Sequence, residues 1–140
     1  QTRRDFWETL FELIEQGTTI LVSTHYMDEA ERCHRLAILD RGRLVSEGEP
    51  VTLMRNIGAT VVEITGPDLK AIRRALSGLH AVWNLNQLGN RLHALLDPGI
   101  ERPGELIRRA MAGTGIAGEV AAAEAGLEDV FVAATGRTRQ

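Results

Sequence analysis

The sequence has 140 residues, of which 44% are hydrophobic and 25% are charged, which suffices for one domain or for two small ones that share a boundary. No apolar stretch approaches the roughly 20 residues of a membrane-spanning helix, and a single cysteine with no Cys/His cluster excludes an internal disulfide and any recognisable zinc site. The net charge is −3, and neither residues 1–58 nor residues 59–140 carry the basic excess of a nucleic-acid-binding surface, so no nucleic acid partner is expected.

The first part of the chain begins with a predicted helix and a predicted buried strand. Residues 5–16 place apolar side chains at helical spacing, and Gly17 is suited to end that helix. The β-branched run TTILVST at residues 18–24 has little alternation, which is typical of a strand buried on both faces of a parallel sheet. A helix over residues 27–34, a β-hairpin over residues 35–48 and a short helix over residues 51–56 follow. This order predicts an α/β fold.

The pattern changes after residue 58, where we place a domain boundary. The expected elements are a strand at 59–65, a helix starting at 66–68, strands at 81–88 and 91–97, a helix over 103–111, a strand at 118–125 and a helix over 127–135. Gly89-Asn90 has the composition of a hairpin turn. The order β-α-β-β-α-β with a terminal helix predicts an α+β ferredoxin-like sandwich for residues 59–140.

The residues around His25 have the pattern of a ligand-binding site. The imidazole stands just outside the carboxyl end of a predicted buried strand, which is where ligands bind in open α/β sheets. The residues ILVSTH at 20–25 and MDEAE at 27–31 closely resemble the switch region, or H-loop, of ABC-type ATPases. The flanks agree: RLAILDRGRLV at 35–45 is similar to the closing hairpin of that domain, EGEP at 47–50 to its exit, and QTRR at 1–4 to the helix after its D-loop.

The far end of the chain narrows this resemblance. GLEDVF at residues 126–131 is similar to the terminal motif of a branch of exporter ATPases, those of drug and antibiotic efflux, which pair with a separate membrane protein. In that branch a small accessory domain follows the ATPase domain, as residues 59–140 would here. The chain is therefore interpreted as a C-terminal fragment: residues 1–58 as the last part of an ABC ATPase domain and residues 59–140 as its accessory domain.

The resemblance implies one catalytic residue, His25, which hydrogen-bonds the γ-phosphate of ATP and helps to hold the attacking water in line. It also implies that the full-length parent is an ATPase coupled to transport that uses ATP and Mg²⁺. Its partners would be a membrane-spanning permease subunit and a second ATPase subunit, with a homodimer favoured. The location implied is cytoplasmic, on the inner face of the cell membrane through the permease.

Several parts of an ATP site are missing from the sequence. There is no phosphate-cradling GxxxxGK[ST] loop, and the family's signature loop and Walker B acid would lie before Gln1. We therefore expect no cofactor-binding or metal-ligating residue in this chain, and neither ATP binding nor hydrolysis by it. Without neighbouring strands from upstream, residues 1–58 are expected to show exposed apolar surface, partial disorder or self-association.

Plainer interpretations remain beside these. His25 could be a surface histidine, and His34, His80, His93 and Cys33 are read as ordinary structural or surface residues. The acidic residues at 28–31 suit the first turn of a helix better than a metal site. Residues 59–140 could form a regulatory or dimerising module, or a small-molecule sensor, and Trp83 there is read as a core or interface residue.

Overall fold

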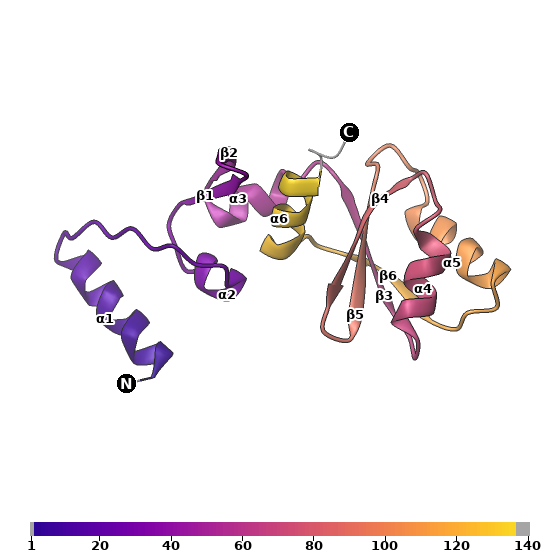
Figure 1. Ribbon diagram of the computed structural model, residues 1–140, viewed down its shortest axis with the longest axis horizontal. Coiled ribbons are helices and arrows are strands. Elements are labelled where there is room, and N and C mark those ends of the chain that lie inside the picture. The colour runs from indigo at the N-terminus through magenta and orange to yellow at the C-terminus, as the bar shows by residue number, and fades with distance from the viewer. Residues whose placement is uncertain (1, 137–140) are drawn as a thin grey trace.

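The structure, a computed structural model, describes residues 2–136 (Figure 1). Helix α1 (Arg3–Glu15) lies at one end, next to the short helix α2 (Met27–Ala30), and a sheet with two helices packed on it lies at the other end. A β-hairpin and the helices α3 (Pro50–Arg55) and α6 (Leu127–Gly136) lie between them. Within the described residues, no helix has both the length and the apolar character that crossing a membrane requires.

Helix α1 begins at a capping box. The Thr2 hydroxyl accepts a hydrogen bond from the Asp5 backbone N–H at 3.3 Å, and the Asp5 carboxylate accepts one from the Thr2 backbone N–H at 3.1 Å. These bonds satisfy two N–H groups that a helix start otherwise leaves unpaired. The helix predicted over residues 5–16 is confirmed, but only Trp7 of its apolar residues is buried, and Phe6 stays 50% exposed.

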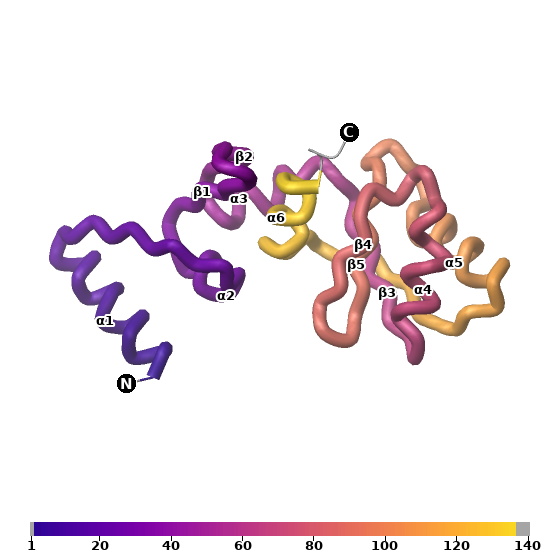
Figure 2. Tube along the Cα trace, in the orientation of Figure 1, coloured from indigo at the N-terminus to yellow at the C-terminus, as the bar shows by residue number. Residues whose placement is uncertain are grey.

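The strand predicted over residues 18–24 is wrong for this structure. The segment between α1 and α2 runs extended (Figure 2), but no strand pairs with it among the described residues. A strand in the middle of a sheet forms only where neighbours on both sides take its N–H and C=O groups. All strand pairs in the described part of the chain are instead antiparallel. The expected exposure of apolar surface is confirmed, since Leu21 is 99% exposed.

The predicted hairpin is confirmed as strands β1 (Leu36–Asp40) and β2 (Arg43–Gly48), which pair antiparallel. Asp40 pairs with Arg43, so the loop has two residues, and both take positive φ angles, 47° at Arg41 and 75° at Gly42. Two successive residues of this hand match the right-handed twist of the flanking strands. Gly42 supplies the positive φ, as the sequence predicted.

The second part of the chain is built on a four-stranded antiparallel sheet. Its strands are β3 (Thr60–Thr65), β4 (Val82–Leu88), β5 (Arg91–Leu96) and β6 (Glu119–Ala123), in the order β4-β5-β3-β6. All four strands were predicted, as were the helices α4 (Leu69–Leu76) and α5 (Pro103–Gly113), which cover one face. The core between this face and its helices comprises Val62, Ile64, Ile72, Leu76, Leu92, Ala94, Leu96, Ile107, Met111 and Val120. Its strand residues recur at every second position, as one face of a pleated sheet requires.

Helix α6 joins the two parts. It contacts β4 and β5 of the sheet, and it also contacts α3 and both strands of the hairpin. Its Leu127 and Val130 form a second buried cluster with Ala30 of α2 and Ile38 of β1. The partly buried residues around this cluster are Met27, Leu36, Val45, Leu53, Met54 and Ile57. The last predicted helix therefore packs against residues on both sides of position 58.

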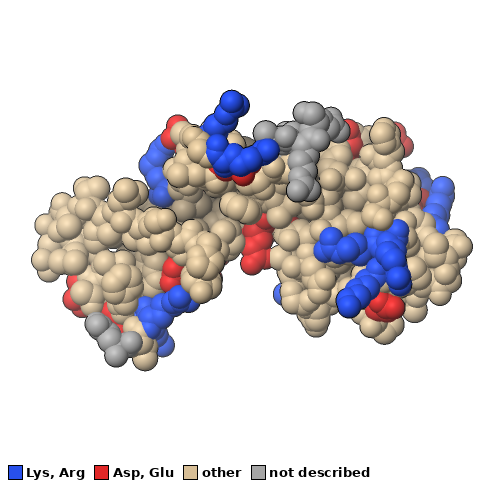
Figure 3. All heavy atoms as spheres, in the orientation of Figure 1, with Lys and Arg blue, Asp and Glu red and all other residues tan. Residues whose placement is uncertain are grey.

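Charged side chains are mixed on the face drawn in Figure 3. Positive groups lie separately over α1, over the β1–β2 hairpin and over α4, with acidic side chains beside them. Some of these oppositely charged side chains form local ion pairs, such as Arg4 and Glu8 at 3.2 Å. Exposed pairs of this kind contribute little to stability.

Candidate functional site

His25 lies in the loop that leads into α2, and its side chain is exposed. Its ring stacks on Tyr26, with the ring centroids 4.2 Å apart and the planes tilted by 33°. The guanidinium of Arg3 lies over the Tyr26 ring, 4.2 Å from its centroid. The Tyr26 ring therefore contacts both the imidazole of His25 and the guanidinium of Arg3, which comes from the start of α1.

The turn before α2 is fixed by Thr24. Its hydroxyl donates to Glu29 Oε2 at 2.6 Å and accepts from the Tyr26 backbone N–H at 3.0 Å. The second contact is the side-chain-to-backbone bond by which Ser and Thr build turns. The first contact, helped by the charge of Arg3 at 3.1 Å, holds the pKa of Glu29 below its ordinary value of 4.5. Glu29 is thus an ionised acceptor that ties the start of α2 to α1.

The acidic residues around α2 lie at the start of that helix. Asp28 and Glu29 lie in the first turn of the helix, where negative charge complements the helix dipole, as the sequence predicted. Among residues 2–136, no group of three or more His, Cys, Asp and Glu side chains is placed to hold a metal ion.

A cleft of about 540 Å³ lies between α1 and α2. Its lining is a mixture of charges and two aromatic rings: Arg3, Arg4, Trp7, Glu8, Phe11, Asp28, Glu29 and Arg32. His25 is not among these residues, so the cleft and the predicted catalytic side chain are separate features.

Comparison with known proteins places these features in a family. No family model matches the chain. The Nod factor export ATP-binding protein I of Burkholderia thailandensis is 38% identical over 142 aligned positions, which cover 100% of this chain and 44% of that protein. Its namesake in Cupriavidus pinatubonensis is 36% identical over 139 residues, covering 98% of this chain and 40% of that protein. The chain belongs to the family of ABC-type ATP-binding subunits.

A third relative aligns with only part of the chain, but at a higher sequence identity. The Nod factor export ATP-binding protein I of Paraburkholderia xenovorans is 48% identical over 81 residues, which cover 56% of this chain and 27% of that protein. The chain spans less than half the length of these curated relatives. Membership in the ABC-type family confirms the resemblance that residues 20–31 and the hairpin indicated.

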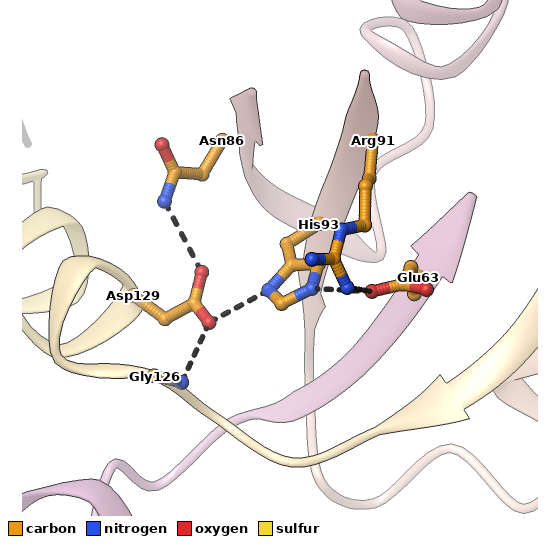
Figure 4. A network of polar contacts seen from close by, with 6 residues as sticks. All are labelled: Glu63, Asn86, Arg91, His93, Gly126 and Asp129. Atoms are coloured by element: carbon orange, nitrogen blue, oxygen red, sulfur yellow. Dashed lines mark hydrogen bonds and ion pairs between the residues drawn. The ribbon is translucent and has the colours of Figure 1, made fainter. Parts of the chain in front are cut away.

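A second polar cluster in this ABC-type chain centres on His93, for which the sequence predicted only an ordinary structural or surface role. His93 lies on β5 and is only 6% exposed, and Asp129 of α6 is fully buried. His93 Nδ1 lies 2.7 Å from Asp129 Oδ2, and its Nε2 lies 3.2 Å from Glu63 Oε2 on β3 (Figure 4). Carboxylate oxygens accept hydrogen bonds, so each ring nitrogen of His93 faces an acceptor.

Two further groups complete the network. Asn86 of β4 donates to Asp129 Oδ1 at 3.2 Å, and the Gly126 backbone N–H donates to Oδ2 at 3.0 Å. On the other side, Arg91 pairs with Glu63 at 3.1 Å. The pair between Arg91 and Glu63 is partly exposed, whereas the contact between His93 and Asp129 is buried. The sequence did carry a signal for it, because His93 stands on β5 between the buried apolar residues Leu92 and Ala94.

The network predicts an acid-sensitive contribution to stability. The hydrogen bond from His93, and secondarily the contact with Arg91, hold the pKa of Glu63 below its ordinary value of 4.5. A carboxyl with a lowered pKa in the folded state stabilises fully above its unfolded pKa, and this contribution is lost as the pH falls through the folded pKa. We expect Glu63→Gln to flatten the fall in unfolding free energy between about pH 5 and pH 3. Urea titrations across that range measure it, with the exposed Glu119→Gln as control; identical slopes for both variants would contradict the assignment.

The other residues that the sequence singled out are Cys33, His34 and Trp83. Cys33 is half-buried, its thiol contacts the Glu29 carbonyl at 3.7 Å, and burial raises its pKa above the ordinary value of 9.0, which fits a packed residue rather than a reactive one. His34 is exposed. Trp83 of β4 is 40% exposed and lines a second cleft, of about 620 Å³, together with His80 and residues of α6.

Proposed function

We propose that the chain is part of an ATP-hydrolysing subunit that powers an ABC-type exporter, and that His25 contacts the γ-phosphate of ATP in that subunit. The observation that carries the proposal is the sequence ILVSTH at residues 20–25 ahead of the acidic turn of α2, in a chain that aligns over its whole length with an export ATP-binding protein. The rate of ATP hydrolysis by the complete subunit, with and without His25→Ala, tests it.

The proposal gives His25 a positioning task. Phosphoryl transfer depends on holding the attacking water in line and on stabilising charge on the phosphate oxygens, and it needs no covalent step on the protein. One imidazole N–H directed at the γ-phosphate supplies such a contact and is satisfied only while that phosphate is present. Thr24 and Tyr26 support it, because their contacts set the turn from which the ring projects.

ATP and Mg²⁺ are assigned to the complete subunit. The described residues offer no cluster suited to a metal ion, and residues 1–140 contain no phosphate-cradling loop. We therefore assign the groups that hold the cation and the phosphates to the rest of the subunit. This chain by itself is expected neither to bind nor to hydrolyse ATP.

The same proposal accounts for the extended segment at residues 18–24. In the complete subunit, neighbouring strands would pair with it and cover Leu21, which turns the loop seen here into the buried strand that its composition favours. His25 would then stand at the carboxyl edge of a sheet. The proposed partners are a second copy of the ATPase subunit and a membrane-spanning permease, which would hold the subunit on the inner face of the membrane.

Residues 59–140 are proposed as an accessory domain of ferredoxin-like topology. The strand order β4-β5-β3-β6 with α4 and α5 on one face supports this. A second candidate function, dimerisation, is favoured by strand β6, an edge strand whose Ala121 and Ala122 are exposed and small enough for close approach. Sedimentation of the whole chain tests it: we expect a dimer at high concentration, and a strict monomer argues against this role. Small-molecule sensing has only the cleft beside Trp83 in its favour.

A further inference from the structure

One buried carboxylate of helix α6 forms hydrogen bonds with the sheet. Asp129 is fully buried, and its two oxygens accept hydrogen bonds from the Asn86 side chain, the His93 ring and the Gly126 backbone N–H. The bond from Gly126 closes the turn that starts α6, while the other two reach strands β4 and β5 (Figure 4). A buried carboxyl group must keep its hydrogen-bond partners, so Asp129 fixes both the start of α6 and its place on the sheet.

The neighbouring residues of α6 face the other part of the chain. Leu127 and Val130, two positions before and one after Asp129, pack with Ala30 of α2 and Ile38 of β1. Met27, the first residue of α2, packs against the same cluster. Helix α2 has only four residues, far fewer than the 12 to 15 or so at which an isolated helix becomes even marginally stable, so its position depends on this packing.

His25 lies directly before Tyr26, the residue that precedes α2. Tyr26 is the residue that caps α2, and its backbone carbonyl accepts the N–H of Ala30 at 3.1 Å. The ring of His25 rests on the ring of Tyr26. A shift of Ala30 therefore moves Tyr26 and, with it, the surface on which the imidazole stacks.

We propose that Asp129 and His93 are positioning residues for His25, acting through α6 and α2. The connection runs from the sheet through the His93–Asp129 contact to α6, and then through Leu127 and Val130 to Ala30 and the His25 loop. An effect of this connection on catalysis rests on the proposed function of His25. The structural coupling between Asp129 and the His25 loop does not depend on that function. The accessory part of the chain thereby sets the orientation of a side chain that lies outside it.

The coupling can be tested in this chain by nuclear magnetic resonance of the His25 ring protons, whose shifts report stacking on Tyr26. We expect Asp129→Ala to move these signals toward the positions found in Tyr26→Ala, in which stacking is abolished. Asp129→Asn keeps an acceptor for His93 and should stay close to the wild type, because the Asn86 amide can turn to satisfy the new NH₂ group. Met111→Ala is the matched control: it truncates a buried side chain in the other core cluster and should leave the His25 signals in place.

The outcomes separate the coupling from loss of stability and from the proposed function. Unmoved His25 signals in folded Asp129→Ala, or an equal shift in Met111→Ala, would overturn the inference. If Asp129→Ala does not fold, Asn86→Ala removes one hydrogen bond to Asp129 and keeps the carboxyl group in place. A smaller shift in the same direction then supports the coupling, and no shift overturns it.

In the complete subunit, we expect Asp129→Ala to lower kcat for ATP hydrolysis with KM nearly unchanged and Asp129→Asn to restore kcat. An unaffected rate in His25→Ala would remove the proposed function while leaving the measured coupling intact.

Discussion

Replacing His25 with alanine in the complete subunit is expected to lower kcat for ATP hydrolysis by about 10²–10³, the usual effect of losing one preorganised hydrogen-bond donor at a developing charge. KM for ATP should change little, because in this account the imidazole contacts only the terminal phosphate, and most binding contacts with the nucleotide lie elsewhere. A loss in kcat at constant KM is the mark of an interaction made mainly in the transition state. Steady-state phosphate release over a range of ATP concentrations separates the two constants.

His34→Ala provides the matched control for this experiment. His34 is an exposed histidine nine positions further along the chain, and it shares none of the contacts of the His25 loop with Thr24 and Tyr26. We expect its replacement to leave both constants within about twofold of the wild type, as for a surface substitution that removes no catalytic contact. Equal effects of the two substitutions, or no effect of His25→Ala, would rule out the assigned role.

The second large effect is expected on stability, from Asp129→Ala. Removing this carboxylate takes the acceptor from His93 Nδ1, the Asn86 amide and the Gly126 backbone N–H, and breaking a buried pair in this way costs about 3–5 kcal/mol. Asp129→Asn should cost less, because it keeps one acceptor and creates no cavity. Urea unfolding of the chain, followed by circular dichroism, measures both changes.

An exposed aspartate shows what an ordinary cap contributes. Asp68 caps α4 by accepting the Ala71 backbone N–H at 2.9 Å, and its loss should cost only about 1 kcal/mol. The expected order is therefore Asp129→Ala well above Asp68→Ala. If the two variants unfold at the same urea concentration, the buried network does not have the energetic role assigned to it.

Local sequence signals predicted the hairpin and the helices of the second part, whose interacting residues lie close together in the chain, but the helix predicted over residues 27–34 ends already at Ala30. The hairpin at residues 36–48 was predictable because Gly42 marks its turn and both strands flank it. The sheet of the second part followed from alternating apolar residues, such as Leu92, Ala94 and Leu96 on β5, and from turn residues between the strands. Helices α4 and α5 likewise carry their own amphipathic pattern.

Long-range partners account for what the sequence did not predict. The apolar run at residues 18–24 has the composition of a central strand, but a strand is defined by its neighbours, and the described residues supply none. The contact between His93 and Asp129 joins residues 36 positions apart, and neither has a spacing motif that indicates the other. The position of α6 between the two parts could not be predicted either, because its pattern shows an apolar face but not the surface it covers.

In the proposed function, the imidazole of His25 contacts the terminal phosphate of ATP. A crystal structure of the complete subunit with Mg²⁺ and a non-hydrolysable ATP analogue tests it most directly. We expect a ring nitrogen of His25 about 2.7–3.2 Å from a γ-phosphate oxygen, with residues 18–24 paired as a strand. An imidazole turned away from a fully bound nucleotide, beyond hydrogen-bonding distance, would contradict it.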